Sequence, residues 1–142
     1  MTVEVMELAA SSVFLLFLTG LLSIALQKSQ GVMVTVCMLL AAAASAIAAI
    51  AGFQAVSSGE VSRAVLLIGL PDLPFHVRID PLAGFFMAMV GLLSFFVSIY
   101  SIGYVRGIAG VRPVTRLAVF YCLFLAGMLM VILADDALFF LV

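Results

Sequence analysis

The sequence has few charged residues, and this scarcity excludes most classes of protein. Only 9% of its 142 residues are Asp, Glu, Lys or Arg, whereas a soluble domain has about 25%. Six basic and seven acidic residues are too few to cover a water-soluble globule, and they form no basic stripe for nucleic acid. Hydrophobic residues make up 67%, which excludes a disordered chain. The class that remains is a polytopic membrane protein.

Cysteine and histidine are also scarce. Cys37 and Cys122 lie inside apolar runs, where a thiol packs as a small side chain. His76 is distant from both in sequence, so the three do not show the spacing of a metal site. A histidine can titrate near neutral pH, but we interpret His76 as a solvated loop residue. Phosphate loops, paired carboxylates and nucleophile–base pairs are absent too, so we expect no catalytic, cofactor-binding or metal-ligating residue.

Four long apolar runs predict membrane-spanning helices. A span needs about 20 mostly apolar residues, and each span must satisfy its own backbone polar groups as a helix. The predicted fold is an all-α transmembrane bundle with four full spans and the start of a fifth at Ala137, in a single segment over residues 1–142. The predicted spans are Leu8–Leu26, Val32–Val56, Pro81–Val105 and Leu117–Ala134.

The loop over residues 57–80 has a mixed character. Pro71 and Pro74 exclude a helix across its middle. Apolar and polar residues then alternate from Phe75 to Asp80, a period that predicts a half-buried strand with Ile79 on its apolar face. Asp80 before Pro81 favours a helix start, because Asp caps free N–H groups and Pro at the first turn loses no hydrogen bond.

The basic residues in the short loops predict the orientation. Lys and Arg are retained on the cytoplasmic side. Placing the first and third turns inside puts four basic residues inside and leaves Arg63 and Arg78 outside. We therefore predict an N-terminus outside the cytoplasmic membrane of a bacterium or archaeon. The four inside residues are Lys28, Arg106, Arg112 and Arg116.

Small and hydroxyl residues recur at helical spacing in three of the spans. Small rows let helix backbones approach closely in lipid, so the second helix is predicted to be an interior one. The hydroxyl groups leave two alternatives open, a water path or hydrogen bonds between helices. The tyrosines are expected at the membrane interface. The sets are Ala41, Ser45, Ala49 and Ala44, Ala48, Gly52 in the second run; Gly84, Gly91, Ser94, Ser98, Ser101 in the third; Ser12, Thr19, Ser23 in the first; and Tyr100, Tyr104, Tyr121.

The central part of each span lacks ionisable residues. Proton relays and ion pathways are marked by buried ionisable groups, so these helices predict a packed bundle rather than a pump. The apolar run Ala137–Val142 would rise only about 9 Å as a helix, less than a third of the hydrocarbon core. We therefore expect the sequence to be the N-terminal part of a larger membrane protein.

Two segments resemble a known family. Val77–Gly107, with Asp80 before a Gly/Ser/Phe-rich helix that ends at Tyr100, Tyr104 and Arg106, resembles the N-terminal signature of antiporter-like, proton-translocating membrane subunits. Leu133–Val142 resembles that family's entry into its fifth helix. Such subunits occur in respiratory complex I, in membrane-bound hydrogenases and in multisubunit cation/proton antiporters. The similarity is greatest to the large membrane subunit of formate hydrogenlyase and hydrogenase 4.

The resemblance implies a proton-translocating subunit whose buried Glu in the fifth helix and later buried Lys residues lie outside this sequence. The chain would then supply supporting helices, with the lipid bilayer and other membrane subunits of a respiratory or hydrogenase complex as partners. It would be no enzyme on its own, and it needs no cofactor and no nucleic acid. Two alternatives stay open: a cation/proton antiporter subunit without a redox partner, and a small stand-alone four-helix scaffold protein.

Overall fold

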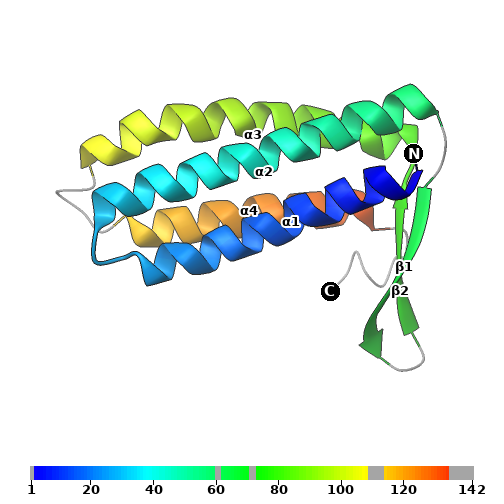
Figure 1. The fold of residues 1–142 in the computed structure, drawn as a ribbon, viewed down its shortest axis with the longest axis horizontal. Helices are drawn as coiled ribbons and strands as arrows, with labels where there is room; N and C mark the ends of the chain where they lie inside the picture. Colours follow the sequence, from blue (N-terminus) through cyan, green and yellow to red (C-terminus); the bar gives the residue numbers. More distant parts are fainter. Residues whose placement is uncertain (1, 60–61, 71–72, 109–113, 135–142) are drawn as a thin grey trace.

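Four long helices form the body of the protein (Figure 1). The computed structural model describes residues 2–59, 62–70, 73–108 and 114–134. Each of the four helices is long and apolar enough to cross a membrane, which confirms the predicted four-span bundle. The predicted fifth helix from Ala137 lies outside the described residues. The helices are α1 (Thr2–Ala25), α2 (Gln30–Ser58), α3 (Pro81–Ile108) and α4 (Thr115–Leu133).

The first helix begins earlier than predicted. α1 starts at Thr2, not near Leu8, and so includes both Glu4 and Glu7. Acidic side chains are favourable near a helix N-terminus, because they face the positive end of the helix dipole. Both glutamates are exposed, so extending the apolar helix through them buries no charge.

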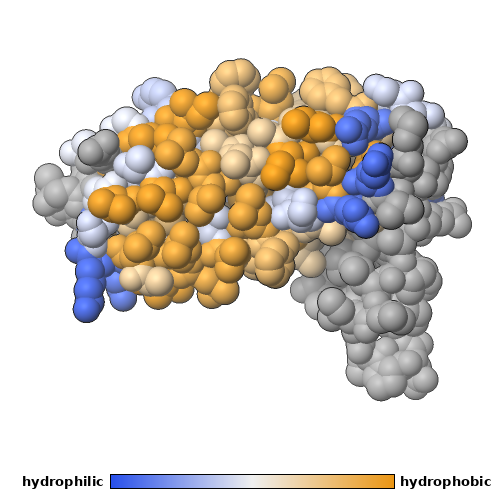
Figure 2. Space-filling view, viewed as in Figure 1, coloured by the Kyte–Doolittle hydropathy of each residue, from blue (hydrophilic) through white to orange (hydrophobic). Residues whose placement is uncertain are grey.

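The helices run up and down, which gives the bundle two different ends (Figure 1). One end, which we call the hairpin end after the β-hairpin that lies there, holds the start of α1, the end of α2, the start of α3 and the end of α4. The turn end holds the short α1–α2 connection, the end of α3 and the start of α4. Figure 2 shows a largely hydrophobic surface across the helical body, with hydrophilic side chains towards its two ends. This distribution fits a body embedded in lipid, with both ends near water.

A β-hairpin, which follows α2 and precedes α3 in the chain, lies at the hairpin end (Figure 1). β1 (Ser62–Leu70) and β2 (Leu73–Ile79) pair antiparallel, with Ser62 opposite Ile79 and Leu70 opposite Leu73. The predicted strand from Phe75 is therefore present, and Ile79 is buried as its apolar position requires. The sequence prediction missed β1, because its run of apolar residues does not alternate with period two.

Small side chains dominate the core around α2. In an apolar 18-residue window of α2, 56% of the residues are buried, whereas 33% are buried in the corresponding window of each of the other three helices. α2 is therefore the interior helix, as predicted. One core cluster contains residues of α1, α2 and α4 together with Ile79 and Met87. This cluster extends from the hairpin end to beyond the middle of the bundle. A second cluster closes the turn end with larger side chains, namely Met33, Val34, Cys37, Met38, Val105, Val114 and Ala118.

Candidate functional site

Glycines bring α2 and α3 into backbone contact towards the hairpin end. A Cβ atom added to Gly91 would lie 2.6 Å from the Ala49 nitrogen and 2.8 Å from the Ser45 carbonyl oxygen. A Cβ on Gly52 would lie 2.5 Å from the Gly84 carbonyl oxygen. Real Cβ atoms do not approach backbone this closely, so only glycine fits at these positions. The small-residue rows predicted from the sequence therefore form the α2–α3 contact, which we call the glycine seam.

The three hydroxyl groups of α1 are buried and donate hydrogen bonds within their own helix. Ser12 donates to the Ala9 carbonyl at 2.7 Å, and Thr19 donates to the Leu15 carbonyl at 2.6 Å. Ser23 donates to the Thr19 carbonyl at 2.9 Å. These are bonds to the preceding turn of the same helix, a known way for serine and threonine to satisfy their own hydroxyls. The choice between a water path and hydrogen bonds between helices stays a prediction for these three residues.

A hydroxyl pair does connect α3 with α4. The Tyr121 hydroxyl lies 2.8 Å from the Ser98 hydroxyl and 3.3 Å from the Ser94 carbonyl oxygen, to which it donates. The predicted hydrogen bonds between helices are therefore confirmed on α3. The half-buried Tyr121 side chain reaches across to α3, and its place at the membrane interface stays a prediction. The sequence shows only a tyrosine near a helix start, because the partner lies 23 residues away.

Tyr100 and Tyr104 do lie as an interface pair would. Their rings stack with centroids 6.1 Å apart near the end of α3. Both side chains are exposed, at 71% and 63%. An exposed, stacked pair at a helix end suits the boundary between lipid and water, where the rings stay apolar and the hydroxyls reach water.

Asp80 organises the junction between β2 and α3. Its carboxylate accepts a hydrogen bond of 2.7 Å from the Ala83 N–H, which satisfies one of the free donors of the first turn. The guanidinium of Arg78 lies 3.4 Å from the same carboxylate. Both side chains are about one-third exposed, so this ion pair contributes little to stability. The predicted cap is thus present, and it aligns the hairpin with α3.

Chemistry-bearing residues are dispersed in the described part of the chain. No group of three or more His, Cys, Asp or Glu side chains gathers there. Cys37 and Cys122 are buried free thiols, in agreement with the packing role expected for them. His76 lies within β2, opposite Val65 in the strand register. The absence of catalytic, cofactor-binding and metal-ligating residues from the whole chain stays a prediction.

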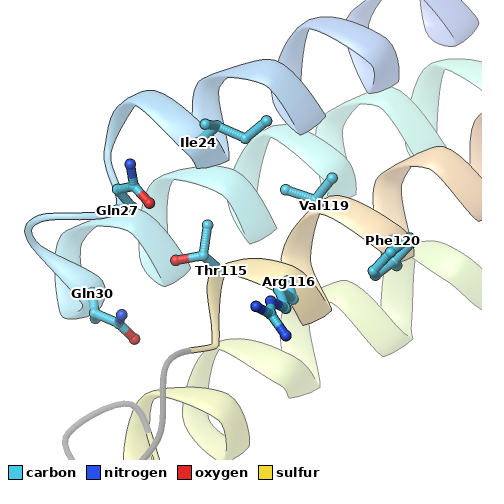
Figure 3. A pocket seen from close by; sticks show the side chains of 7 residues that line it. All are labelled: Ile24, Gln27, Gln30, Thr115, Arg116, Val119 and Phe120. Carbon is cyan, nitrogen blue, oxygen red and sulfur yellow. The ribbon is translucent and has the colours of Figure 1, made fainter.

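A groove with a volume of about 940 Å³ lies at the turn end (Figure 3). Ile24 lines the groove from α1, Gln27 from the connection that follows α1, and Gln30 from the start of α2. The Gln30 side-chain oxygen accepts a 3.0 Å hydrogen bond from the Val114 N–H, which joins the start of α2 to the start of α4. The α4 wall consists of Thr115, Arg116, Val119 and Phe120.

No motif in the sequence predicted this groove, which we call the turn-end groove. Its residues come from three helices and the α1–α2 connection. Among them, only Arg116 had a predicted role, as one of the basic residues that indicate the orientation. The groove forms where the end of α1 lies beside the starts of α2 and α4. At the hairpin end, Glu4 lines two smaller hollows of about 360 and 550 Å³, both of which also include Gln54.

One comparison with known proteins finds a family that is similar to part of the chain. Residues 66–112 match the model of the family described as NADH-Ubiquinone oxidoreductase (complex I), chain 5 N-terminus. The match extends from within β1 to beyond the end of α3, and it includes the Val77–Gly107 segment. It confirms the similarity to antiporter-like membrane subunits that this segment indicated. No curated protein matches the chain.

Proposed function

We propose, from the similarity of residues 66–112 to the complex I chain 5 N-terminal family, that the chain is the N-terminal part of a proton-translocating membrane subunit. The subunit works in a redox-driven complex of the NADH-quinone oxidoreductase or membrane-bound hydrogenase type. The four helices support neighbouring helices that carry the protons. They act with the other membrane subunits of the complex and have no enzyme activity alone.

The observation that carries the supporting role is the apolar interior of the spans. No acidic residue occurs between Glu7 and Glu60 or between Asp80 and Asp135. The only basic residues in those stretches lie in or next to the connections at the turn end. Because proton relays need ionisable groups inside the membrane, these helices supply packing surfaces. The glycine seam supports this role by fixing α2 and α3 against each other.

The charge distribution supports an outside N-terminus. The connections at the turn end carry Lys28, Arg112 and the flanking Arg106 and Arg116, and they carry no acidic residue. The positive-inside rule places such an end in the cytoplasm. The N-terminus and the hairpin then lie outside the cytoplasmic membrane of a bacterium or archaeon.

The partners can be tested by purification from native membranes. We would place an affinity tag at the N-terminus of the chromosomal gene product, solubilise in a mild detergent and identify the subunits that copurify. Hydrogenase or quinone-reductase subunits are the expected result. Antiporter subunits alone would replace the redox assignment with a cation/proton antiporter. No partner, with a native mass near 15.0 kDa, would favour the stand-alone scaffold. An unrelated membrane protein with the same tag is the control.

The orientation can be tested with a membrane-impermeant maleimide on intact cells. In a background of Cys37→Ala and Cys122→Ala, Ser57→Cys places a thiol at the hairpin end and Ser29→Cys at the turn end. Both serines are exposed. The thiol at position 57 should react in intact cells, and the thiol at position 29 only after lysis. The reverse pattern would place the N-terminus in the cytoplasm.

A further inference from the structure

The charged residues are separated between the two ends of the bundle. The acidic residues that the structure describes, Glu4, Glu7 and Asp80, lie at the hairpin end, together with Arg63 and Arg78. Lys28 and Arg116 lie at the turn end, whose sequence segments contain no acidic residue. An anion that approaches the turn end therefore meets positive charge without competition from a carboxylate on this chain.

The turn-end groove has a polar end and an apolar wall. Thr115 and Arg116 stand in the first turn of α4, and Gln27 follows the end of α1. One turn deeper towards the middle of the bundle, Ile24 on α1 and the pair Val119 and Phe120 on α4 line the same space (Figure 3). The lining thus changes from hydrogen-bond donors to hydrocarbon along the direction of the membrane normal.

The depth of Arg116 matches that of a lipid headgroup. α4 has 19 residues and so spans about 28 Å, close to the roughly 30 Å of the hydrocarbon core. Arg116 is the second residue of α4 and is exposed. Its guanidinium therefore lies at the boundary of the hydrocarbon, where lipid phosphates are found. A guanidinium binds phosphate with two parallel hydrogen bonds, which adds geometric specificity to the charge attraction.

We infer that the turn-end groove binds one anionic phospholipid. The phosphate lies on the Arg116 guanidinium, and an acyl chain lies along Ile24, Val119 and Phe120. The apolar wall favours a lipid over a free anion, because a soluble phosphate would leave three apolar side chains uncovered. The net positive turn end favours an anionic headgroup over a zwitterionic one, whose ammonium finds no carboxylate in the segments of this end.

Native mass spectrometry of the full chain in a nonionic detergent tests this inference. The probes are phosphatidylglycerol and phosphatidylethanolamine with identical acyl chains. The wild-type protein should bind phosphatidylglycerol more tightly. Arg116→Gln should weaken that binding about ten-fold, because a charge-assisted hydrogen-bond pair is lost. The matched control is Lys28→Gln, which removes an exposed charge from the same end outside the groove and should change binding less than about two-fold.

A second variant tests the apolar wall without removing charge. Val119→Trp fills the groove and should weaken the binding of both lipids while Arg116 is intact. This variant also keeps the test valid if Arg116→Gln does not fold, as judged by its thermal unfolding. Equal binding by wild type and Arg116→Gln would overturn the inference, as would unchanged binding by Val119→Trp.

Two further outcomes distinguish other occupants. Displacement of the lipid by millimolar inorganic phosphate would identify a site for a soluble anion and would overturn the lipid assignment. In native membranes, a photo-crosslinking amino acid at position 120 should react with lipid. Crosslinking to a neighbouring subunit instead would show that a protein covers the groove. Neither result depends on which redox or antiporter partners the subunit has.

Discussion

The two ends of the bundle differ in charge, in packing and in how their helices begin. The hairpin end carries Glu4, Glu7 and Asp80, an alanine- and glycine-rich core and the glycine seam. The turn end carries Lys28 and Arg116, a core with methionine and valine, and the turn-end groove. One bundle therefore combines a region held by close backbone contact with a region that contains an open groove.

The glycine seam should give the largest effect in a test of this comparison. Gly91→Ala places a methyl group 2.6 Å from the backbone nitrogen of Ala49, which a side-chain rotation cannot relieve. We expect the free energy of unfolding in detergent to fall by about 2 kcal/mol, as for an overpacked core. Titration of the purified protein with a denaturing detergent, followed by circular dichroism, measures the change.

The control lies on the same helix at the other end. A Cβ on Gly103 would meet no described heavy atom within 4 Å, so Gly103→Ala should leave the unfolding midpoint unchanged or raise it. A similar loss for Gly91→Ala and Gly103→Ala would show that the substitution acts through the helix itself and not through the α2–α3 contact.

The start of α3 should give the next largest effect. The Asp80 carboxylate caps α3 at the hairpin end, whereas Ser29 at the start of α2 makes no side-chain capping bond to the described residues. Asp80→Ala should therefore lower the free energy of unfolding by about 1 kcal/mol, and Ser29→Ala should have little effect. The same denaturation measurement applies to both variants.

A further variant separates the two contacts of Asp80. Asn is an equally good N-cap residue but carries no charge. Asp80→Asn should keep most of the stability if the cap matters, because the exposed pair with Arg78 is worth little. A loss equal to that of Asp80→Ala would instead assign the effect to the ion pair.

The smallest effect is expected at the hydroxyl pair between α3 and α4. Tyr121→Phe removes the hydroxyl that contacts Ser98 and Ser94, at a cost of about 0.6 kcal/mol, the average for such bonds in membranes. Ser98→Ala should cost no more. The double variant should cost about as much as the larger single one, because both changes break one contact. Additive losses in denaturation would show that the two hydroxyls act separately.

The spans and the seam could be predicted from the sequence because both depend on local pattern. Length and hydropathy define a span, and the spacing of Gly84, Gly91 and the α2 alanines defines a close-packing row. Asp80 was predictable for the same reason, since a cap lies next to the turn that it satisfies.

The missed features depend on contacts between distant segments. β1 exists because β2 pairs with it, and its own residues do not alternate. Tyr121 reaches across to α3 because Ser98 of that helix faces it. The turn-end groove needs Gln30 to bond the backbone of Val114, 84 residues away. No single-segment periodicity contains that information.

The unequal helix lengths make this bundle sensitive to bilayer thickness. α2 has 29 residues and is about 44 Å long, whereas α4 is only about 28 Å long. In a core of about 30 Å, α2 has to tilt or extend into the headgroup region, while α4 has no length to spare. A thicker bilayer would therefore draw both ends of α4 towards hydrocarbon, and Arg116 would respond first by extending its side chain to the headgroups.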